Sequence, residues 1–147
     1  MPTHYEKKFI VLHHTLTPRD FTSFEAVNNY HKNKWDLKSS LGFYIGYHYF
    51  IDGQGKIWQG RADWEEGAHC KERGRNRDSI GVCLAGNFDQ EMPSAQQLTA
   101  LKKILKQLMV RHGLPEARLK FHRDYAPHKS CPGKSIKKGF VSGLLAG

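Results

Sequence analysis

Short apolar runs separated by polar stretches dominate the chain and predict a sheet. Runs typical of buried strands occupy residues 9–15, 79–85 and 119–122. Two further runs, at 47–51 and 56–60, flank the sequence DGQG and predict a β-hairpin, because glycine-rich turns of this kind join antiparallel strands. The hydrophobic pattern therefore indicates at least five strands.

Two other stretches have the spacing of helices. The capping-box sequence TSFE at 22–25 predicts a helix over about 23–33, and SAQQ at 94–97 predicts a longer helix that Gly113 ends. Residues 61–78 are polar and punctuated by glycine, which is typical of a long functional loop. Strands that alternate with helices predict an α/β fold, in which helices flank a central mixed sheet.

Length and composition limit the kind of protein. The 147 residues are a typical length for one domain, and 39% hydrophobic with 25% charged residues are globular values. The longest apolar run, 9–12, is far short of the ~20 residues that a membrane helix needs. Residues 1–8 are polar and charged, so we expect no signal peptide and synthesis in the cytoplasm. We expect 1–147 to form a single, monomeric domain.

Positive charge is concentrated in the last third of the chain. Of the net charge of +9, residues 1–101 contribute none (12 basic, 12 acidic), whereas 102–147 hold 11 basic and 2 acidic side chains. Such segregation indicates an anionic partner, and its sign alone does not choose among nucleic acid, wall polymers and membrane surfaces. No nucleic-acid-reading motif is visible, so we expect no nucleic acid partner. The basic tail, 134–147, either attracts anionic envelope polymers or is a docked helix whose lysines face solvent.

Three groups of histidine and cysteine side chains lie at the ends of predicted strands or in the loop that follows. His13 and His14 end the first strand, His122 ends the last, and Cys131 lies in the loop that follows. Imidazole and thiolate are zinc ligands, and three protein ligands with one open position are typical of catalytic zinc. Because neighbouring strand residues point to opposite faces, His13 and His14 cannot both face one metal. Composition alone does not decide, since any one of nine histidines is more often a surface or packing residue.

Five sequence blocks occur together in a characteristic order. They are VLHHT (11–15), GYHYFID (46–52), GAHC (67–70), NRDSIGVCLAGNFD (76–89) and FHRDYAPHKSCPG (121–133). Together they resemble the type-2 N-acetylmuramoyl-L-alanine amidases, which share a fold with the peptidoglycan recognition proteins. The resemblance covers about residues 8–133. It implies zinc-dependent hydrolysis of the amide bond between N-acetylmuramic acid and L-alanine in peptidoglycan, and it is most similar to compact phage or prophage endolysins.

The resemblance also implies roles for individual residues. The first histidine of HHT, the histidine of HRD and the cysteine of CPG match the family's ligands for one zinc ion, which assigns His13, His122 and Cys131. Tyr47 matches the family's catalytic tyrosine, and Lys129 its catalytic lysine.

Three positions leave alternatives open. His128 competes with Lys129 for the lysine position, and the spacing to the cysteine favours Lys129. His69 matches a position in the substrate groove of the family, so we expect it to bind substrate. Cys83 stands where some branches carry a catalytic glutamate, which implies that this chain relies on Tyr47 and Lys129 instead.

A second function is open on the same fold, namely recognition of peptidoglycan without cleavage. Family members that only bind typically lack the cysteine ligand, whereas Cys131 is present here. The sequence therefore favours the enzyme over the recognition module.

Overall fold

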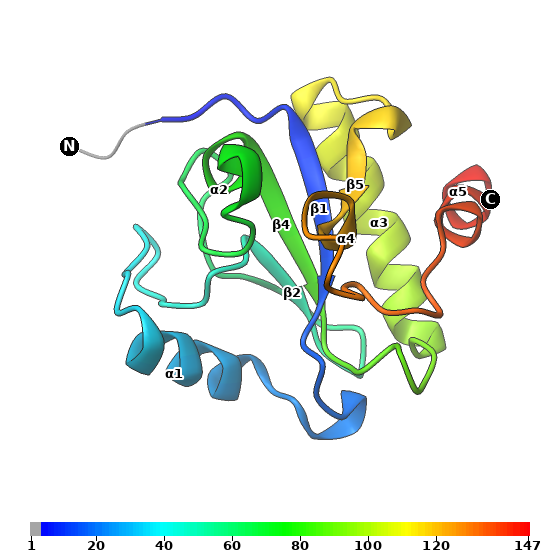
Figure 1. Ribbon diagram of the computed structural model, residues 1–147, viewed down its shortest axis with the longest axis horizontal. Coiled ribbons are helices and arrows are strands. Elements are labelled where there is room, and N and C mark those ends of the chain that lie inside the picture. Colours follow the sequence, from blue (N-terminus) through cyan, green and yellow to red (C-terminus); the bar gives the residue numbers. More distant parts are fainter. Residues whose placement is uncertain (1–3) are drawn as a thin grey trace.

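Five strands form one mixed sheet in the computed structural model, which describes residues 4–147 (Figure 1). The strands are β1 (Phe9–His14), β2 (Tyr49–Ile51), β3 (Ile57–Gln59), β4 (Ser79–Leu84) and β5 (Leu119–Phe121). They lie in the order β3-β2-β4-β1-β5. β1 pairs in parallel with β4 and β5, β2 pairs in parallel with β4, and β2 and β3 form the antiparallel hairpin. The predicted mixed sheet is confirmed. Residues 1–3 of the polar N-terminal segment lie outside the described residues.

Helices cover both faces of this sheet (Figure 1). They are α1 (Phe24–Lys34), α2 (Arg75–Asp78), α3 (Ala95–His112), α4 (His122–Tyr125) and α5 (Lys138–Ala146), with 3₁₀ turns at Arg19–Phe21, Glu72–Gly74 and Glu116–Arg118. The long helix α3 packs on one face, and α1 contributes Phe24 to the apolar cluster on the other. Within residues 4–147, no helix combines the length and the apolar character needed to cross a membrane.

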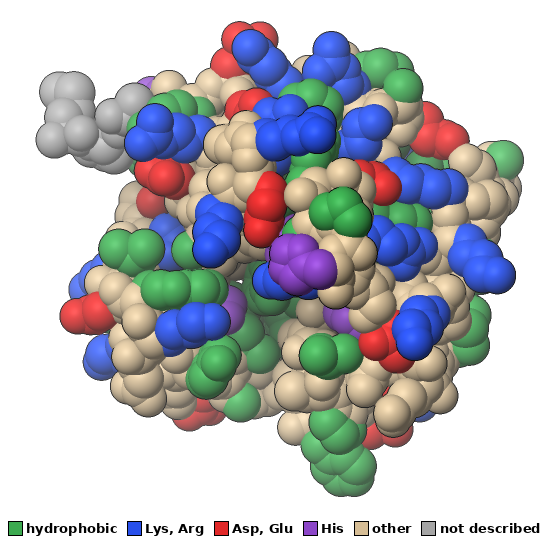
Figure 2. All heavy atoms as spheres, viewed as in Figure 1, with side chains coloured by type: hydrophobic (Ala, Val, Ile, Leu, Met, Phe, Trp, Pro, Cys, Tyr) green, Lys and Arg blue, Asp and Glu red, His purple; other side chains and the backbone are tan. Residues whose placement is uncertain are grey.

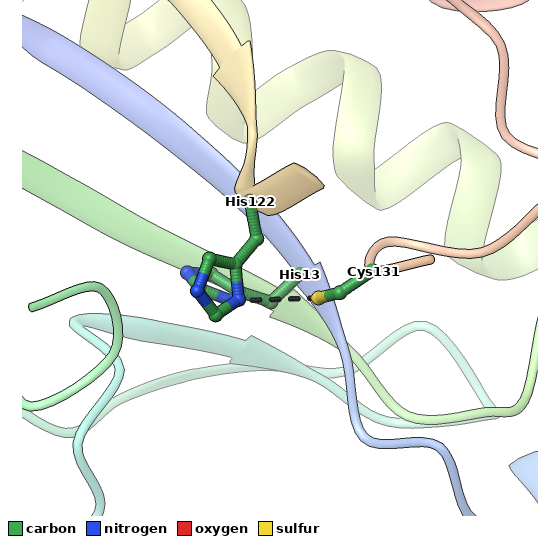
Figure 3. A group of neighbouring side chains, drawn as sticks. All are labelled: His13, His122 and Cys131. Carbon is green, nitrogen blue, oxygen red and sulfur yellow. Dashed lines mark hydrogen bonds between the residues drawn. The ribbon is translucent and has the colours of Figure 1, made fainter. Parts of the chain in front are cut away.

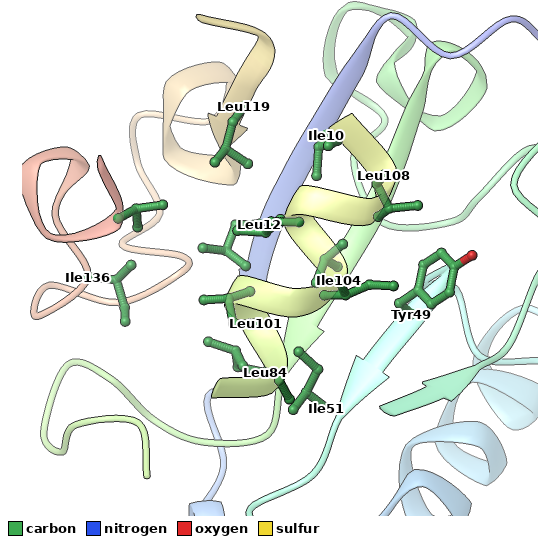
Figure 4. Close-up of a cluster of buried hydrophobic side chains, with 14 of the residues drawn as sticks. Ile10, Leu12, Tyr49, Ile51, Leu84, Leu101, Ile104, Leu108, Leu119 and Ile136 are labelled. Atoms are coloured by element: carbon green, nitrogen blue, oxygen red, sulfur yellow. The ribbon is translucent and has the colours of Figure 1, made fainter. Parts of the chain in front are cut away.

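Alternation along β1 divides its side chains between the two faces. Ile10 and Leu12 enter the large core beneath α3 (Figure 4). His13 is paired in register with Cys83 of β4, whose side chain belongs to the smaller cluster on the α1 face. Because paired residues of parallel strands point to the same face, His13 also lies on the α1 face, at the carboxyl end of its strand. The fold therefore places this imidazole opposite the main core.

The two predicted helix caps have different outcomes. The capping box of α3 is confirmed, since the Ser94 hydroxyl accepts from the Gln97 N–H and the Gln97 side chain accepts from the Ser94 N–H, both at 3.0 Å. The box predicted at Thr22 is wrong. Ser23 is the cap, and its hydroxyl accepts from the N–H of Ala26 at 3.1 Å. The Thr22 hydroxyl donates instead to the backbone carbonyl four residues earlier, and the helix begins one residue later than the predicted box requires.

The C-terminal segment is docked on the core. Ile136 and Val141 are buried in the large apolar cluster, and Phe140, Leu144 and Leu145 pack against it. The apolar side chains of the tail thus stabilise a docked helix, α5. The three lysines of the tail, Lys134, Lys137 and Lys138, are exposed. This confirms the structural role for the apolar part of the tail and leaves only the lysines for an external partner.

Candidate metal site

Three side chains far apart in the sequence converge at the carboxyl end of the sheet. His13 comes from the end of β1, His122 from the first residue after β5, and Cys131 from the loop that follows α4 (Figure 3). Their ligand atoms lie within 4.8 Å of one another, and Nδ1 of His13 is 3.5 Å from Sγ of Cys131. β1 and β5 are parallel neighbours, so residues at their carboxyl ends meet at one edge. The structure therefore brings the three predicted metal ligands together.

The start of α4 differs from the prediction in one respect. The sequence pattern places His122 at the end of a strand, whereas β5 ends at Phe121 and His122 begins the helix. The carboxylate of Asp124 accepts the Phe121 N–H at 2.8 Å and caps this short helix. The strand therefore turns into a helix at His122, one residue earlier than the pattern predicts.

The protonation states of these side chains suit a metal cation. His13 is 2% and His122 is 7% exposed, and burial lowers the pKa of both imidazoles, which keeps them neutral. Burial raises the pKa of the Cys131 thiol to about 12, so its anion needs a cation beside it. The backbone N–H of His14 already donates to that sulfur at 3.4 Å. Two neutral imidazoles and one thiol that a cation would ionise are a donor set that fits zinc.

The histidines next to His13 and Tyr47 in the sequence bond to backbone groups and not to the three ligands. The ring of His14 accepts the backbone N–H of Phe88 at 3.1 Å. The ring of His48, which is fully buried, accepts the N–H of Gly81 at 3.0 Å and lies 2.8 Å from the carbonyl of Glu65. Both imidazoles therefore fix loops and strands inside the protein.

Tyr47 lies beside the ligand His13, and Lys129 lies in the same loop as Cys131, two residues before it. The Tyr47 ring centroid is 5.2 Å from that of His13. Burial and the thiols of Cys83 and Cys131 raise the pKa of Tyr47, so its phenol remains protonated. Lys129 is exposed, and after burial its positive charge is among the causes that lower the pKa of His13 and His122.

Two further positions are His128, the alternative to Lys129, and Cys83, which stands where some branches of the family carry a glutamate. His128 is exposed and acts electrostatically on His122, whereas Lys129 acts on both histidine ligands. Cys83 is fully buried in β4, where burial raises the pKa of its thiol. A protonated thiol at this position supplies no carboxylate base.

His69 and Glu72 contact the ligands themselves, which the sequence pattern does not reveal. His69 is 8% exposed, and its Nδ1 lies 2.8 Å from Nε2 of His13. Glu72 places a carboxylate oxygen 3.3 Å from Nε2 of His122. Substrate binding by His69 stays a prediction. The segment from 61 to 78 has no periodicity that would orient its side chains, and it holds five acidic residues, so the sequence does not single out Glu72 as a partner for a histidine.

The molecular surface is hollowed beside this site. Figure 2 shows a depression between the region of α1 and that of α4, with histidine side chains at its edge.

Comparison with known proteins gives the family. The model of the family described as N-acetylmuramoyl-L-alanine amidase matches residues 4–134. Among solved structures, the N-acetylmuramoyl-L-alanine amidase LysC from Clostridium intestinale superposes with a TM-score of 0.81 at 27% identity, covering 97% of this chain and 87% of that one.

Two kinds of relative match the sequence. Peptidoglycan-recognition protein 2 of Holotrichia diomphalia is 39% identical over 105 residues, which are 67% of this chain and 52% of that protein. The endolysin of Escherichia phage T7 is 30% identical over 135 residues, which are 88% of this chain and 82% of that protein. The chain spans about half the length of the peptidoglycan-recognition proteins it matches. With its fold and the match over residues 4–134, the chain belongs to the N-acetylmuramoyl-L-alanine amidase family.

Proposed function

We propose that the chain is a zinc-dependent amidase that hydrolyses the bond between N-acetylmuramic acid and the L-alanine of the stem peptide. The observation that carries this proposal is the meeting of His13, His122 and Cys131 within 4.8 Å. These residues would hold one zinc ion. When bound, zinc supplies a Lewis acid that polarises the scissile carbonyl and lowers the pKa of a water molecule to about 7.

The other residues of the site supply what amide hydrolysis further requires. We assign the Lys129 ammonium, two residues before Cys131, as the donor for the negative charge that develops on the carbonyl oxygen. The Tyr47 phenol packs on His13 and keeps its proton, so it can orient the attacking water or deliver a proton toward the leaving amine. Both groups are thus complementary to charges that form only during the reaction.

The phage endolysins among the relatives support a lytic role. The T7 endolysin is 30% identical over 88% of this chain, and that of Enterobacteria phage K11 is 37% identical over 69%. We propose that this chain acts on the bacterial cell wall as a phage or prophage endolysin.

Digestion of purified peptidoglycan tests the activity directly. Mass spectrometry should find stem peptides with a free L-alanine amino group and glycan strands that keep intact muramic acid. A chelator should abolish this release and added zinc should restore it, with one zinc per chain by metal analysis. Binding to peptidoglycan with no released peptide would instead identify a recognition module, and cleavage between sugars would contradict the proposal.

The lysines of the C-terminal segment offer a second contact with the wall. Lys134 and Lys137 are exposed, whereas Lys138 pairs with Asp124 at 2.5 Å. We propose that the exposed lysines attract anionic envelope polymers. Exposed charges are screened over ~10 Å at 0.1 M salt and ~3 Å at 1 M. Adsorption to purified walls should therefore weaken steeply between these salt concentrations in a sedimentation assay.

Matched lysine variants separate this attraction from net charge. Lys134→Gln with Lys137→Gln should weaken adsorption at low salt and leave turnover of a small muropeptide unchanged. The control Lys8→Gln with Lys38→Gln removes the same charge from exposed positions outside the last third. If both pairs weaken adsorption equally, only net charge matters, and if neither does, the tail is purely structural.

A further inference from the structure

A directional chain of hydrogen bonds runs from His13 into the protein. Nδ1 of His13 faces the Cys131 sulfur, so Nε2 carries the proton whenever Nδ1 binds a metal. That Nε2 is 2.8 Å from Nδ1 of His69, which must then accept. Nε2 of His69 consequently carries the proton and lies 3.3 Å from the Ser79 hydroxyl, which donates to the Arg75 carbonyl at 2.5 Å. In this series of hydrogen bonds, the His69 ring and the Ser79 hydroxyl each accept one bond and donate one.

His122 has a partner of its own in the same segment. Its Nε2 lies 3.3 Å from the Glu72 carboxylate, so Nδ1 is the nitrogen that His122 offers to a metal. The Glu72 oxygen also accepts from the Cys70 thiol at 3.6 Å. A carboxylate on the far nitrogen of a metal-binding histidine fixes the ring's tautomer and orientation.

Residues 67–79, here called the support segment, are held rigidly against the sheet. The Asn76 side chain accepts the N–H groups of His69 and Cys70, both at 2.7 Å. A Cβ on Gly81 of β4 would lie 2.6 Å from the His69 ring, so the glycine makes room for that ring. The Lys7 ammonium is 4% exposed and donates to the carbonyls at 65, 77 and 79 at 2.6, 2.9 and 3.2 Å.

We propose that His69 and Glu72 are positioning residues, and that the support segment sets the tautomer and orientation of His13 and His122. This inference rests on the proposed zinc site and assigns its outer partners. It also gives His69 a role other than substrate contact, because both of its ring nitrogens already have partners within the protein. His69 and Glu72 are three residues apart in the same loop, so one loop orients two of the three ligands.

Isosteric pairs of variants test whether the acceptor at each position matters. His69→Asn keeps an acceptor near the position of Nδ1, whereas His69→Leu has nearly the same shape and none. Glu72→Gln and Glu72→Met form the matching pair at the second position. We expect His69→Leu and Glu72→Met to weaken zinc affinity ~10–100-fold, measured by competition with a chromogenic chelator. His69→Asn and Glu72→Gln should recover most of this loss.

A second readout separates orientation from folding. Substitution with Co²⁺ should give a visible absorption spectrum that changes in His69→Leu and returns in His69→Asn, whereas thermal unfolding of the metal-free variants should be similar within each pair. Equal zinc affinity and identical Co²⁺ spectra within both pairs would overturn the proposal, as would an increase in substrate KM alone, which would indicate substrate contact by His69.

Two controls keep this inference distinct from the zinc site itself. Cys131→Ser should abolish zinc binding, and retention of zinc there would contradict the metal site rather than its outer partners. Cys70, Glu72 and His122 also lie close enough together to hold a metal. Cys70→Ser should therefore keep one zinc per chain; a wild-type content of two that falls to one in this variant would show that Glu72 is a ligand and overturn its positioning role.

Discussion

Replacing Cys131 by serine should leave a folded protein that has lost zinc and measurable amidase activity. Cys131 is the one thiol of the three proposed ligands, and a thiolate offsets part of the positive charge of the metal. Serine does not ionise near neutral pH, so the site would keep two neutral imidazoles and no anion. We expect a loss of activity of more than ~100-fold, the upper end of the effects seen when only an outer partner of a ligand is removed.

The same substitution at Cys70 is the matched control for this experiment. Cys70 is also a buried thiol, and serine can still donate to Glu72 as the thiol does. Metal analysis should find one zinc in Cys70→Ser and none in Cys131→Ser, with circular dichroism unchanged in both. Full activity of a zinc-free Cys131→Ser protein would contradict the assignment of the metal site.

The sheet could be predicted because apolar runs carry the signal for buried strands. Residues 9–15 and 79–85 read as continuous apolar stretches because β1 and β4 are central strands, buried on both faces. The start of α3 could also be predicted, from the capping box of Ser94 and Gln97. Hydroxyl and amide side chains at the start of a helix accept hydrogen bonds from nearby backbone N–H groups, so the signal is local in the sequence. The same reasoning gave a wrong cap at Thr22, because Ser23 offers the helix an equivalent hydroxyl one residue later.

Contacts within the site depend on loop geometry, which has no periodic signal. His13, His122 and Cys131 could be found because His13 lies near the end of β1, His122 directly follows β5, and all three lie in the family's motifs. His69 and Glu72 could not be paired with them from spacing, since their direction depends on Asn76 and on the absence of a side chain at Gly81. Side chains that orient a ligand are thus visible only when the fold of the loop is known.

Lys129→Ala and Tyr47→Phe should each keep zinc and the fold and lose ~10²-fold or more in kcat. Lys129 lies two residues before Cys131, and removal of one donor to a developing oxyanion typically costs ~3–4 kcal/mol. Tyr47→Phe removes only the hydroxyl and leaves the ring that packs on His13, so its effect reports proton transfer or water orientation. Single-turnover rates with a soluble muropeptide, beside zinc content, measure both losses.

His128→Ala is the control that decides the assignment across this loop. His128 and Lys129 are both exposed neighbours, and Lys129 has the spacing to Cys131 that matches the family's lysine. His128→Ala should therefore retain near-normal kcat. If His128→Ala is inactive while Lys129→Ala is normal, the catalytic role belongs to the imidazole, and the motif alignment is displaced by one residue. Tyr47 is not one of the three proposed zinc ligands, so Tyr47→Phe should keep its zinc. Loss of zinc in this variant would show that the Tyr47 hydroxyl helps to hold the ligands in place.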